Sequence, residues 1–139
     1  GRVRITCDYR RLNEATVIPQ TSTSRIDELL DTLGSANFFS SFDIMSGFHQ
    51  TMIGGDSLPL TGFCTASGLY EFLVMPMGTS APGHFQRVMR QVTADLAHFV
   101  SVYIDDVLVR SNDEVSMVDY IERFLTALTK HSLKISPGK

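Results

Sequence analysis

Two adjacent acids, Asp105 and Asp106, interrupt an otherwise apolar stretch formed by residues 99–102 and 107–109. Successive strand residues point to opposite faces of a sheet, so both acids serve one site only if the chain turns at them, as at a hairpin tip. An acidic turn is also compatible with a plain solvated loop, because hairpin tips favour Asp. Residues 103–106 alone leave both interpretations open.

A third acid, Asp43, is the best companion for this pair. It ends the strand-like residues 38–42 and precedes a Gly-containing turn, so it is expected at the sheet edge where Asp105 and Asp106 emerge. Mg²⁺ prefers hard oxygen ligands and takes carboxylates from the protein and phosphate oxygens from the substrate. Two such ions would activate an attacking hydroxyl, hold a phosphate and stabilise the leaving oxygen. Taken alone, Asp43 is more simply interpreted as a surface acid, because Asp is seldom fully buried unless it is paired.

The composition is that of an ordinary globular domain, with 43% hydrophobic and 19% charged residues among 139. No apolar run approaches the roughly 20 residues that a membrane span requires. The two cysteines, Cys7 and Cys64, favour a reducing intracellular setting over a disulfide framework or a zinc site. The net charge of −3 argues against nucleic-acid binding by this chain alone. Because it starts at Gly1 without an initiator Met and stops abruptly, the chain is expected to be a piece of a longer protein.

Hydrophobic periodicity and turn residues predict an α+β fold, with mainly antiparallel strands covered on one face by helices. The last helix is expected to carry an apolar stripe formed by Val115, Val118, Ile121, Leu125 and Leu128. The expected strands are at 1–5, 38–42 and 133–136, with two hairpins, one of 60–65 and 69–75 and one at the acids. Gly68 is expected at positive φ in the first hairpin. The expected helices are at 25–33, capped by Ser24, from 80 to about 98, and after a cap at Ser111 or Asn112.

Blocks of sequence throughout the chain occur together in a characteristic order. They lie at residues 4–13, 25–31, 39–40, 43, 46–50, 68–72, 75–76, 81–82, 85–86 and 102–108. Each block is weak by itself, whereas their joint occurrence in this order is specific. On these blocks the chain resembles the reverse transcriptase domain of Ty3/gypsy-type long-terminal-repeat retrotransposons, over essentially all of its length.

The resemblance implies a palm, an antiparallel sheet with helices packed on one face, together with part of the fingers. By this likeness the fingers would comprise about residues 1–36 and 46–79, and the palm about 37–45 and 80–139, with the thumb and RNase H regions absent. It also implies that Asp43, Asp105 and Asp106 are catalytic and hold two Mg²⁺ ions, with Mn²⁺ as a possible substitute. The implied activity is RNA-directed DNA synthesis in retrotransposon replication, in which a primer 3′-hydroxyl attacks the α-phosphate of a deoxynucleotide.

Further residues receive roles from the same resemblance. Arg4 would contact the nucleotide triphosphate, and Phe48 would pack beneath the sugar and exclude a 2′-hydroxyl. Gln86 and Tyr103 would lie against template or primer. The implied partners are an RNA or DNA template with its primer, deoxynucleotides, and the RNase H and integrase modules of a parent polyprotein, without a membrane and in a cytoplasmic virus-like particle.

Several positions depart from the family pattern. Leu60 stands where a Lys usually precedes Thr61, Ser41 replaces another common Lys, and residues 21–24 replace a proline-rich stretch. One residue is missing near Met77, where a Phe is usual. These departures leave open the alternative of a catalytically inactive remnant that persists as an interaction module. An unrelated metal-dependent phosphotransfer domain is a third, weaker alternative, because no phosphate-binding loop is present in the sequence.

Overall fold

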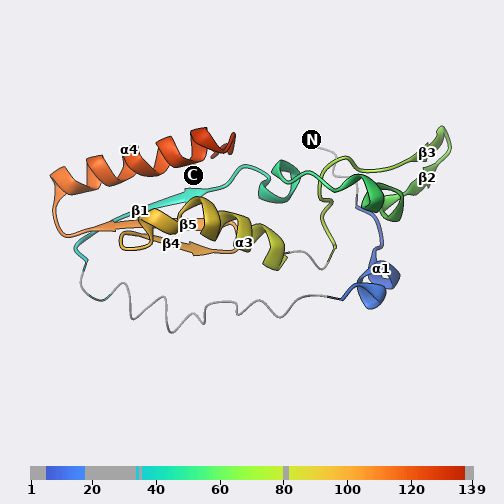
Figure 1. The fold of residues 1–139 in the computed structure, drawn as a ribbon, viewed down its shortest axis with the longest axis horizontal. Coiled ribbons are helices and arrows are strands. Elements are labelled where there is room, and N and C mark those ends of the chain that lie inside the picture. The colour runs from blue at the N-terminus through green and yellow to red at the C-terminus, as the bar shows by residue number, and fades with distance from the viewer. Residues whose placement is uncertain (1–5, 18–33, 35, 80–81, 137–139) are drawn as a thin grey trace. The chain divides into compact units, whose positions relative to one another are not determined.

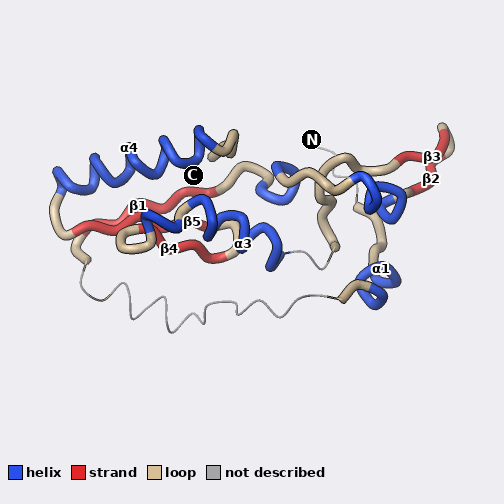
Figure 2. The backbone as a smooth tube through the Cα atoms, in the orientation of Figure 1, coloured by secondary structure: helices blue, strands red, loops and turns tan. Residues whose placement is uncertain are grey.

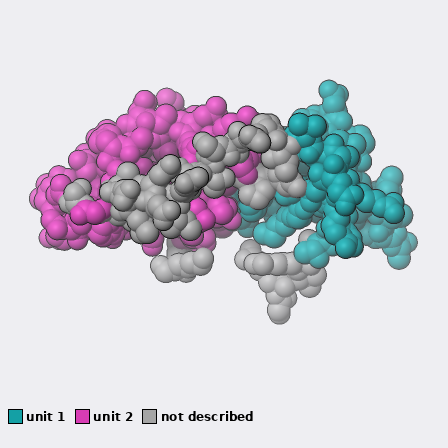
Figure 3. All heavy atoms as spheres, turned by 90° about the horizontal axis from the view of Figure 1, so that it is seen from below, with its two compact units in different colours: residues 1–20, 46–82 teal, residues 21–45, 83–139 magenta. Residues whose placement is uncertain are grey.

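The computed structural model describes residues 6–17, 34, 36–79 and 82–136. The chain divides into two compact units, drawn in different colours in Figure 3. Unit 1 comprises residues 1–20 and 46–82, and unit 2 comprises residues 21–45 and 83–139. The expected strand at 1–5 and the expected helix at 25–33 lie outside the described residues.

Unit 2 is built on a three-stranded antiparallel sheet with the order β1-β5-β4 (Figures 1 and 2). The strands are β1 (Phe38–Asp43), β4 (Val100–Tyr103) and β5 (Asp106–Ser111). β4 and β5 form a hairpin that turns at Ile104 and Asp105, while β1 pairs with the other edge of β5. Both the strand before Asp43 and the hairpin at the two acids are therefore confirmed.

The register gives the sheet one apolar face and one polar face. Opposite residues in an antiparallel pair share a face, and this rule groups the buried side chains of Val100, Val102, Val107 and Val109. The alternate positions place Asp43 and Asp106 together on the other face. Burying one face of the sheet thus fixes which side chains remain available for chemistry on the opposite face.

Helices cover the apolar face. α4 (Glu114–Lys130) contacts β5 and β1, and the ring of its fully buried Phe124 lies 5.3 Å from that of Phe42. α3 (Pro82–Val92) adds the fully buried Phe85 and Met89 to the core of the unit. The predicted α+β class, an antiparallel sheet with helices on one face, is confirmed.

The helix that begins near residue 82 ends earlier than expected. α3 stops at Val92, and a separate 3-10 helix, η3 (Ala94–Leu96), follows before β4. The hydroxyl of Thr93 donates a hydrogen bond to the carbonyl of Met89 at 2.9 Å. Val92 and Thr93 are both β-branched, and β-branched residues have a lower helix propensity. The apolar periodicity continues through this break, which is why it predicted one helix to about residue 98.

The N-cap of α4 is also different from the two predicted residues. Asp113 caps the helix, and its carboxylate accepts hydrogen bonds from the backbone nitrogen and the hydroxyl of Ser116, at 2.8 and 2.7 Å. Ser111 instead ends β5, and its hydroxyl donates to the carbonyl of Asp113. The hydrogen bonds from Ser116 lower the pKa of the exposed Asp113 carboxyl.

The predicted apolar stripe of this last helix is mostly not the face that the structure buries. The residues of α4 that are buried are Met117, Phe124 and Leu128, of which only Leu128 belongs to the predicted stripe. Val118 and Leu125 are 64% and 36% exposed. The helix carries two neighbouring apolar stripes, and the sheet buries the one that contains Phe124.

Unit 1 has short elements: α1 (Arg10–Ala15), the 3-10 helices η1 (Gly47–Gln50) and η2 (Gly55–Thr61), and the hairpin of β2 (Phe63–Thr65) with β3 (Gly68–Tyr70). Gly68 has a φ of 141°, as expected for this turn. The hairpin is shorter than predicted because η2 occupies residues up to Thr61. The hydroxyl of the buried Tyr9 donates a hydrogen bond to the carbonyl of Thr61 at 3.0 Å. Desolvation, and to a smaller extent a hydrogen bond with Cys7, raises the pKa of Tyr9 to about 12.

The expected strand at 133–136 is reduced to one isolated bridge between Ile135 and Ile44. Two backbone hydrogen bonds flank this bridge, from Met45 to the Lys134 carbonyl and from Ser136 to the Asp43 carbonyl. No helix in the described part of the chain has the length and apolar character needed to cross a membrane.

Truncation of the central aromatic residue of α4 tests this packing. Phe124→Ala is expected to lower the free energy of unfolding by about 3–5 kcal/mol, because it removes a fully buried ring that contacts the sheet. The matched control is Val115→Ala, which changes an 82% exposed residue of the same helix and should stay within about 0.5 kcal/mol. Urea denaturation followed by circular dichroism measures both, and equal losses would contradict the observed burial.

Candidate active site

Asp43 and Asp106 lie directly opposite each other on β1 and β5. Opposite Cα atoms in an antiparallel pair are about 4.5–5.5 Å apart, and their side chains share one face. The backbone nitrogen of Ile44 donates to the carbonyl of Asp105 at 3.2 Å, which ties the end of β1 to the hairpin turn. The structure therefore brings the three predicted acids together at one end of the sheet.

The turn that presents Asp105 has an unusual backbone. Ile104, the first of its two residues, has a φ of 55°, in the left-handed region that β-branched residues rarely adopt. This conformation costs about 1–2 kcal/mol for an L-residue, and such costs are concentrated at functional sites. A two-residue turn lets Asp105 project from the tip while Asp106 starts the next strand.

Asp105 is the most perturbed acid of the three. Its Oδ1 atom is buried and has no hydrogen-bond partner among the described residues. Burial raises the pKa of the Asp105 carboxyl, and the negative charges of Asp106 and then Asp43 raise it further. The negative charges of Asp106 and Asp43 therefore both act against ionisation of Asp105.

The donor set suits a hard divalent cation. Within the described residues, however, no three His, Cys, Asp or Glu side chains are gathered closely enough to form a ready-made metal cluster. The orphaned Asp105 Oδ1 and the mutual repulsion of the acids are what a cation would relieve. The residues fit Mg²⁺ in type and in backbone position, and their side chains would have to rotate toward the ion.

Tyr103 and Gln86 also belong to unit 2. Tyr103 is the partner of Asp106 across the β4–β5 hairpin, so it lies in the same cross-strand row as Asp43. Gln86 is only 4% exposed, and its Nε2 atom has no partner among the described residues. The next residue, Arg87, is exposed and approaches Nδ1 of His84 at 3.0 Å. On α3, therefore, Arg87 is accessible to a ligand, whereas Gln86 is buried.

The two residues predicted to contact the nucleotide are placed differently. Arg4 lies outside the described residues. Phe48 belongs to unit 1, where it is partly buried in η1 and its carbonyl accepts a hydrogen bond from Thr51 at 3.1 Å. The predicted roles of both residues stay predictions.

Two features of the site escaped the sequence patterns. The residue type of Ile104 gives no sign of its positive φ, because Gly, Asn or Asp normally occupies such a position. The burial of Gln86, whose Nε2 atom has no hydrogen-bond partner among the described residues, was not expected on a helix position taken as ligand-facing. The two-residue spacing of the turn was the one available sign that a left-handed residue would be needed before Asp105.

Replacement of Asp105 tests the electrostatic conflict. Because the folded-state pKa of Asp105 lies above the ordinary value of 3.8, the contribution of Asp105 to the free energy of unfolding should fall as the pH rises from below 3.8 through the raised folded pKa. Asp105→Asn removes the charge, so the variant should exceed the wild type in stability at pH 7 and match it below 3.8. Urea denaturation across this range measures the difference, and a variant less stable at pH 7 would refute the conflict.

Comparison with known proteins identifies the family. A family model described as "Reverse transcriptase (RNA-dependent DNA polymerase)" matches residues 1–139. The "Retrovirus-related Pol polyprotein from transposon 297" of Drosophila melanogaster is 35% identical over 141 residues, which cover 100% of this chain and 13% of that protein. The "Enzymatic polyprotein" of cauliflower mosaic virus (strain D/H) is 36% identical over 140 residues, covering 100% of this chain and 21% of that protein.

The fold agrees with a solved structure of a more distant protein. A foamy viral protease-reverse transcriptase, solved in complex with double-stranded DNA, superposes with a TM-score of 0.85. The sequence identity is 23%, and the superposition covers 96% of this chain and 24% of the foamy viral chain. The chain thus spans well under a third of the proteins it matches, and over its whole length it belongs to the reverse transcriptase (RNA-dependent DNA polymerase) family.

Proposed function

We propose that this chain is the palm and part of the fingers of an RNA-directed DNA polymerase that copies a retrotransposon. The observation that carries the proposal is the cross-strand pairing of Asp43 with Asp106, next to the turn that presents Asp105. The family match over the whole chain supports the same reaction class. The polymerase activity itself belongs to the longer protein of which such a domain is a part.

In this proposal the three carboxylates hold two divalent ions, with Mg²⁺ as the preferred metal. When bound, the ions would activate the primer 3′-hydroxyl and stabilise the charge on the transferred phosphate and the leaving pyrophosphate. The chain's own contribution is position: the register fixes Asp43 beside Asp106, and the strained turn holds Asp105 in partial burial. Tyr103, in the same cross-strand row, would lie against the primer end.

The proposed source is a Ty3/gypsy-type Pol polyprotein, with RNase H and integrase as further modules. The ordered sequence blocks motivate this subtype, and a transposon polyprotein at 35% identity supports it. The plant-virus polyprotein at 36% identity shows that related domains also occur outside transposons. Template with primer and deoxynucleotides are the proposed substrates, with Arg4 and Phe48 at the nucleotide and Gln86 at the template or primer.

Primer extension tests the catalytic assignment. In a protein that spans the complete polymerase region, Asp105→Asn or Asp106→Asn should abolish extension on an RNA template with Mg²⁺, because each removes one charge from the metal-binding set. Asp95→Asn is the matched control, since Asp95 is an exposed acid of the same unit in η3. Extension at the wild-type rate by either of the first two variants would rule out the mechanism.

Metal binding can be followed without activity. Millimolar Mg²⁺ should raise the melting temperature of the 139-residue chain, because the ion relieves the repulsion at Asp105. Asp43→Asn and Asp106→Asn should reduce that shift, whereas Asp95→Asn should leave it unchanged. An equal shift in all of these proteins would assign the effect to nonspecific binding of the ion.

The isolated chain is expected to bind primer-template weakly. Its net charge of −3 leaves few cations to displace counterions from phosphates. A gel shift at low ionic strength measures this, with the longer polymerase region as the positive control. Tight binding by the 139 residues alone would show that the fold concentrates its positive charge more effectively than its composition indicates.

A further inference from the structure

The outer side of α3 carries polar and basic side chains that the core of unit 2 does not use. Phe85 and Met89 are fully buried, so they fix which side of the helix faces the core. Residues three or four positions apart lie on one side of a helix, and this spacing groups His84, Arg87 and Gln91. All three are exposed. These three residues form the α3 outer face.

Arg87 has a neutral partner on this face. Its guanidinium lies 3.0 Å from Nδ1 of His84. A guanidinium can only donate hydrogen bonds, so Nδ1 accepts and the imidazole is neutral, with its proton on Nε2. No acidic side chain among the described residues forms an ion pair with Arg87, in contrast to Arg10 and Arg123. The contact with His84 therefore orients the guanidinium and leaves its charge uncompensated.

The sequence around α3 lacks acids altogether. Residues 72–94 contain no Asp or Glu, and they form the longest acid-free stretch of a chain whose net charge is −3. α3 itself contains Arg87 and Arg90 and no acid that could offset them. The helix is therefore positively charged within an acidic chain, which favours an anionic ligand at its exposed side.

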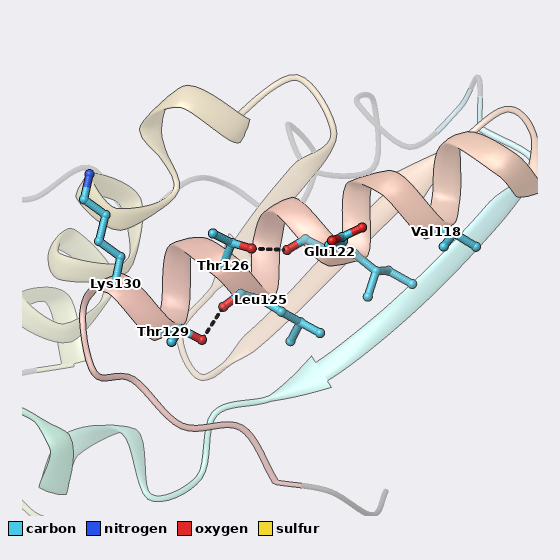
Figure 4. Close-up of a pocket in the computed structure, with 7 residues that line it drawn as sticks. Val118, Glu122, Leu125, Thr126, Thr129 and Lys130 are labelled. Atoms are coloured by element: carbon cyan, nitrogen blue, oxygen red, sulfur yellow. Dashed lines mark hydrogen bonds between the residues drawn. The ribbon is translucent and has the colours of Figure 1, made fainter.

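α4, the longer helix of unit 2, offers a different surface. Val118 and Leu125 line an apolar groove on this helix (Figure 4). The charge of Arg123 on the same helix is already paired with Asp119. An anion that approaches α4 would thus meet apolar side chains or a compensated arginine, whereas the α3 outer face presents an uncompensated one.

We propose that the α3 outer face binds a phosphodiester group of the primer-template, with Arg87 as the cation and His84 as a second donor. The fork of a guanidinium matches two phosphate oxygens, and the Nε2–H group of His84 is the free donor beside it. α3 and the three acids belong to the same compact unit, so both would act on one bound nucleic acid. This inference rests on the proposed polymerase function and adds to it a contact with the strand backbone.

Nucleic acid suits this face better than an acidic polypeptide. The chain belongs to the family of RNA-dependent DNA polymerases, whose reaction requires a bound template and primer. Each phosphodiester carries one negative charge, and the α3 outer face offers one uncompensated guanidinium as its counterpart. The contact is therefore expected to hold one phosphate, independent of base sequence.

The salt dependence of binding tests this contact in a protein that spans the complete polymerase region. A labelled primer-template duplex is titrated by fluorescence anisotropy at several NaCl concentrations. Each neutralised phosphate contributes about 0.9 to the slope of log K against log salt for a duplex. Arg87→Gln should therefore lower the magnitude of the slope by about 0.9. It should also weaken binding about tenfold at low salt, whatever the base sequence.

Two further variants separate charge from hydrogen bonding. His84→Phe keeps a ring and removes both nitrogens, so binding should weaken about threefold while the slope stays unchanged. Arg87→Lys keeps the charge and the slope but loses the fork, so its affinity should fall between those of the wild type and Arg87→Gln.

The matched control is Arg123→Gln, which removes the same charge from an exposed arginine that is paired with Asp119. This variant should leave the slope and the affinity unchanged. Circular dichroism confirms that all of the variants fold, as expected for substitutions of exposed side chains.

Three results would overturn the proposal. The first is an equal slope for the wild type and Arg87→Gln; the polymerase assignment would still stand if Asp105→Asn abolished extension. The second is an equal loss of slope in Arg123→Gln, which would assign the effect to net charge. The third is binding of a poly-glutamate peptide that Arg87→Gln abolishes while primer-template binding is unchanged, which would assign the face to an acidic polypeptide. A wild-type protein that binds no primer-template would overturn both the contact and the proposed function.

Discussion

The register between β1 and β5 is the constraint on which the candidate site depends. It sets Asp43 opposite Asp106, and a slip of one residue would exchange the two faces of β1 and move Asp43 toward the core. The core prevents that slip, because Phe42 packs against Phe124 on the opposite face. The like charges of Asp43 and Asp106 are therefore held on neighbouring strands by contacts between apolar side chains. The position of the acids on the polar face therefore depends on the packing of the apolar face.

The site is costly to the folded state in two separate ways. Ile104 adopts a left-handed conformation, and Asp105 is partly buried beside two other acids. Neither cost can be relieved by moving the turn, because the hairpin ladder starts at Tyr103 and Asp106 on either side. A cation bound beside Asp105 would relieve the electrostatic cost, whereas it would not change the residue type that adopts the left-handed conformation at Ile104. The electrostatic cost is therefore connected with the proposed binding of a cation, whereas the backbone strain is connected with the position of Asp105 at the turn.

The sequence predicted the position of the acids better than the packing of the helices. Asp105 and Asp106 stand between two apolar runs, so alternation and turn geometry placed them at a hairpin tip, and the family resemblance then chose a shared site over a solvated loop. In α4, by contrast, apolar residues occur on two neighbouring stripes, and periodicity cannot choose between them. The choice is made by Phe42 on the sheet, a contact between residues far apart in sequence.

Local competition explains the remaining differences. Ser111, Asn112 and Asp113 are all good capping residues, and the cap falls on Asp113 because β5 extends through Ser111. The left-handed Ile104 could not be predicted from its residue type, which normally avoids that conformation. The helix expected at 25–33 and the strand expected at 1–5 lie outside the described residues, so their predictions stand untested.

β1 connects the candidate metal site with the core. Its polar face carries Asp43, its apolar face carries Phe42, and one of its edges pairs with β5. At the other edge the Asp43 carbonyl accepts a hydrogen bond from the backbone nitrogen of Ser136. Asp43 is therefore held by backbone hydrogen bonds on both edges of its strand and by the packing of the neighbouring Phe42, so its position depends on contacts that involve no charged side chain.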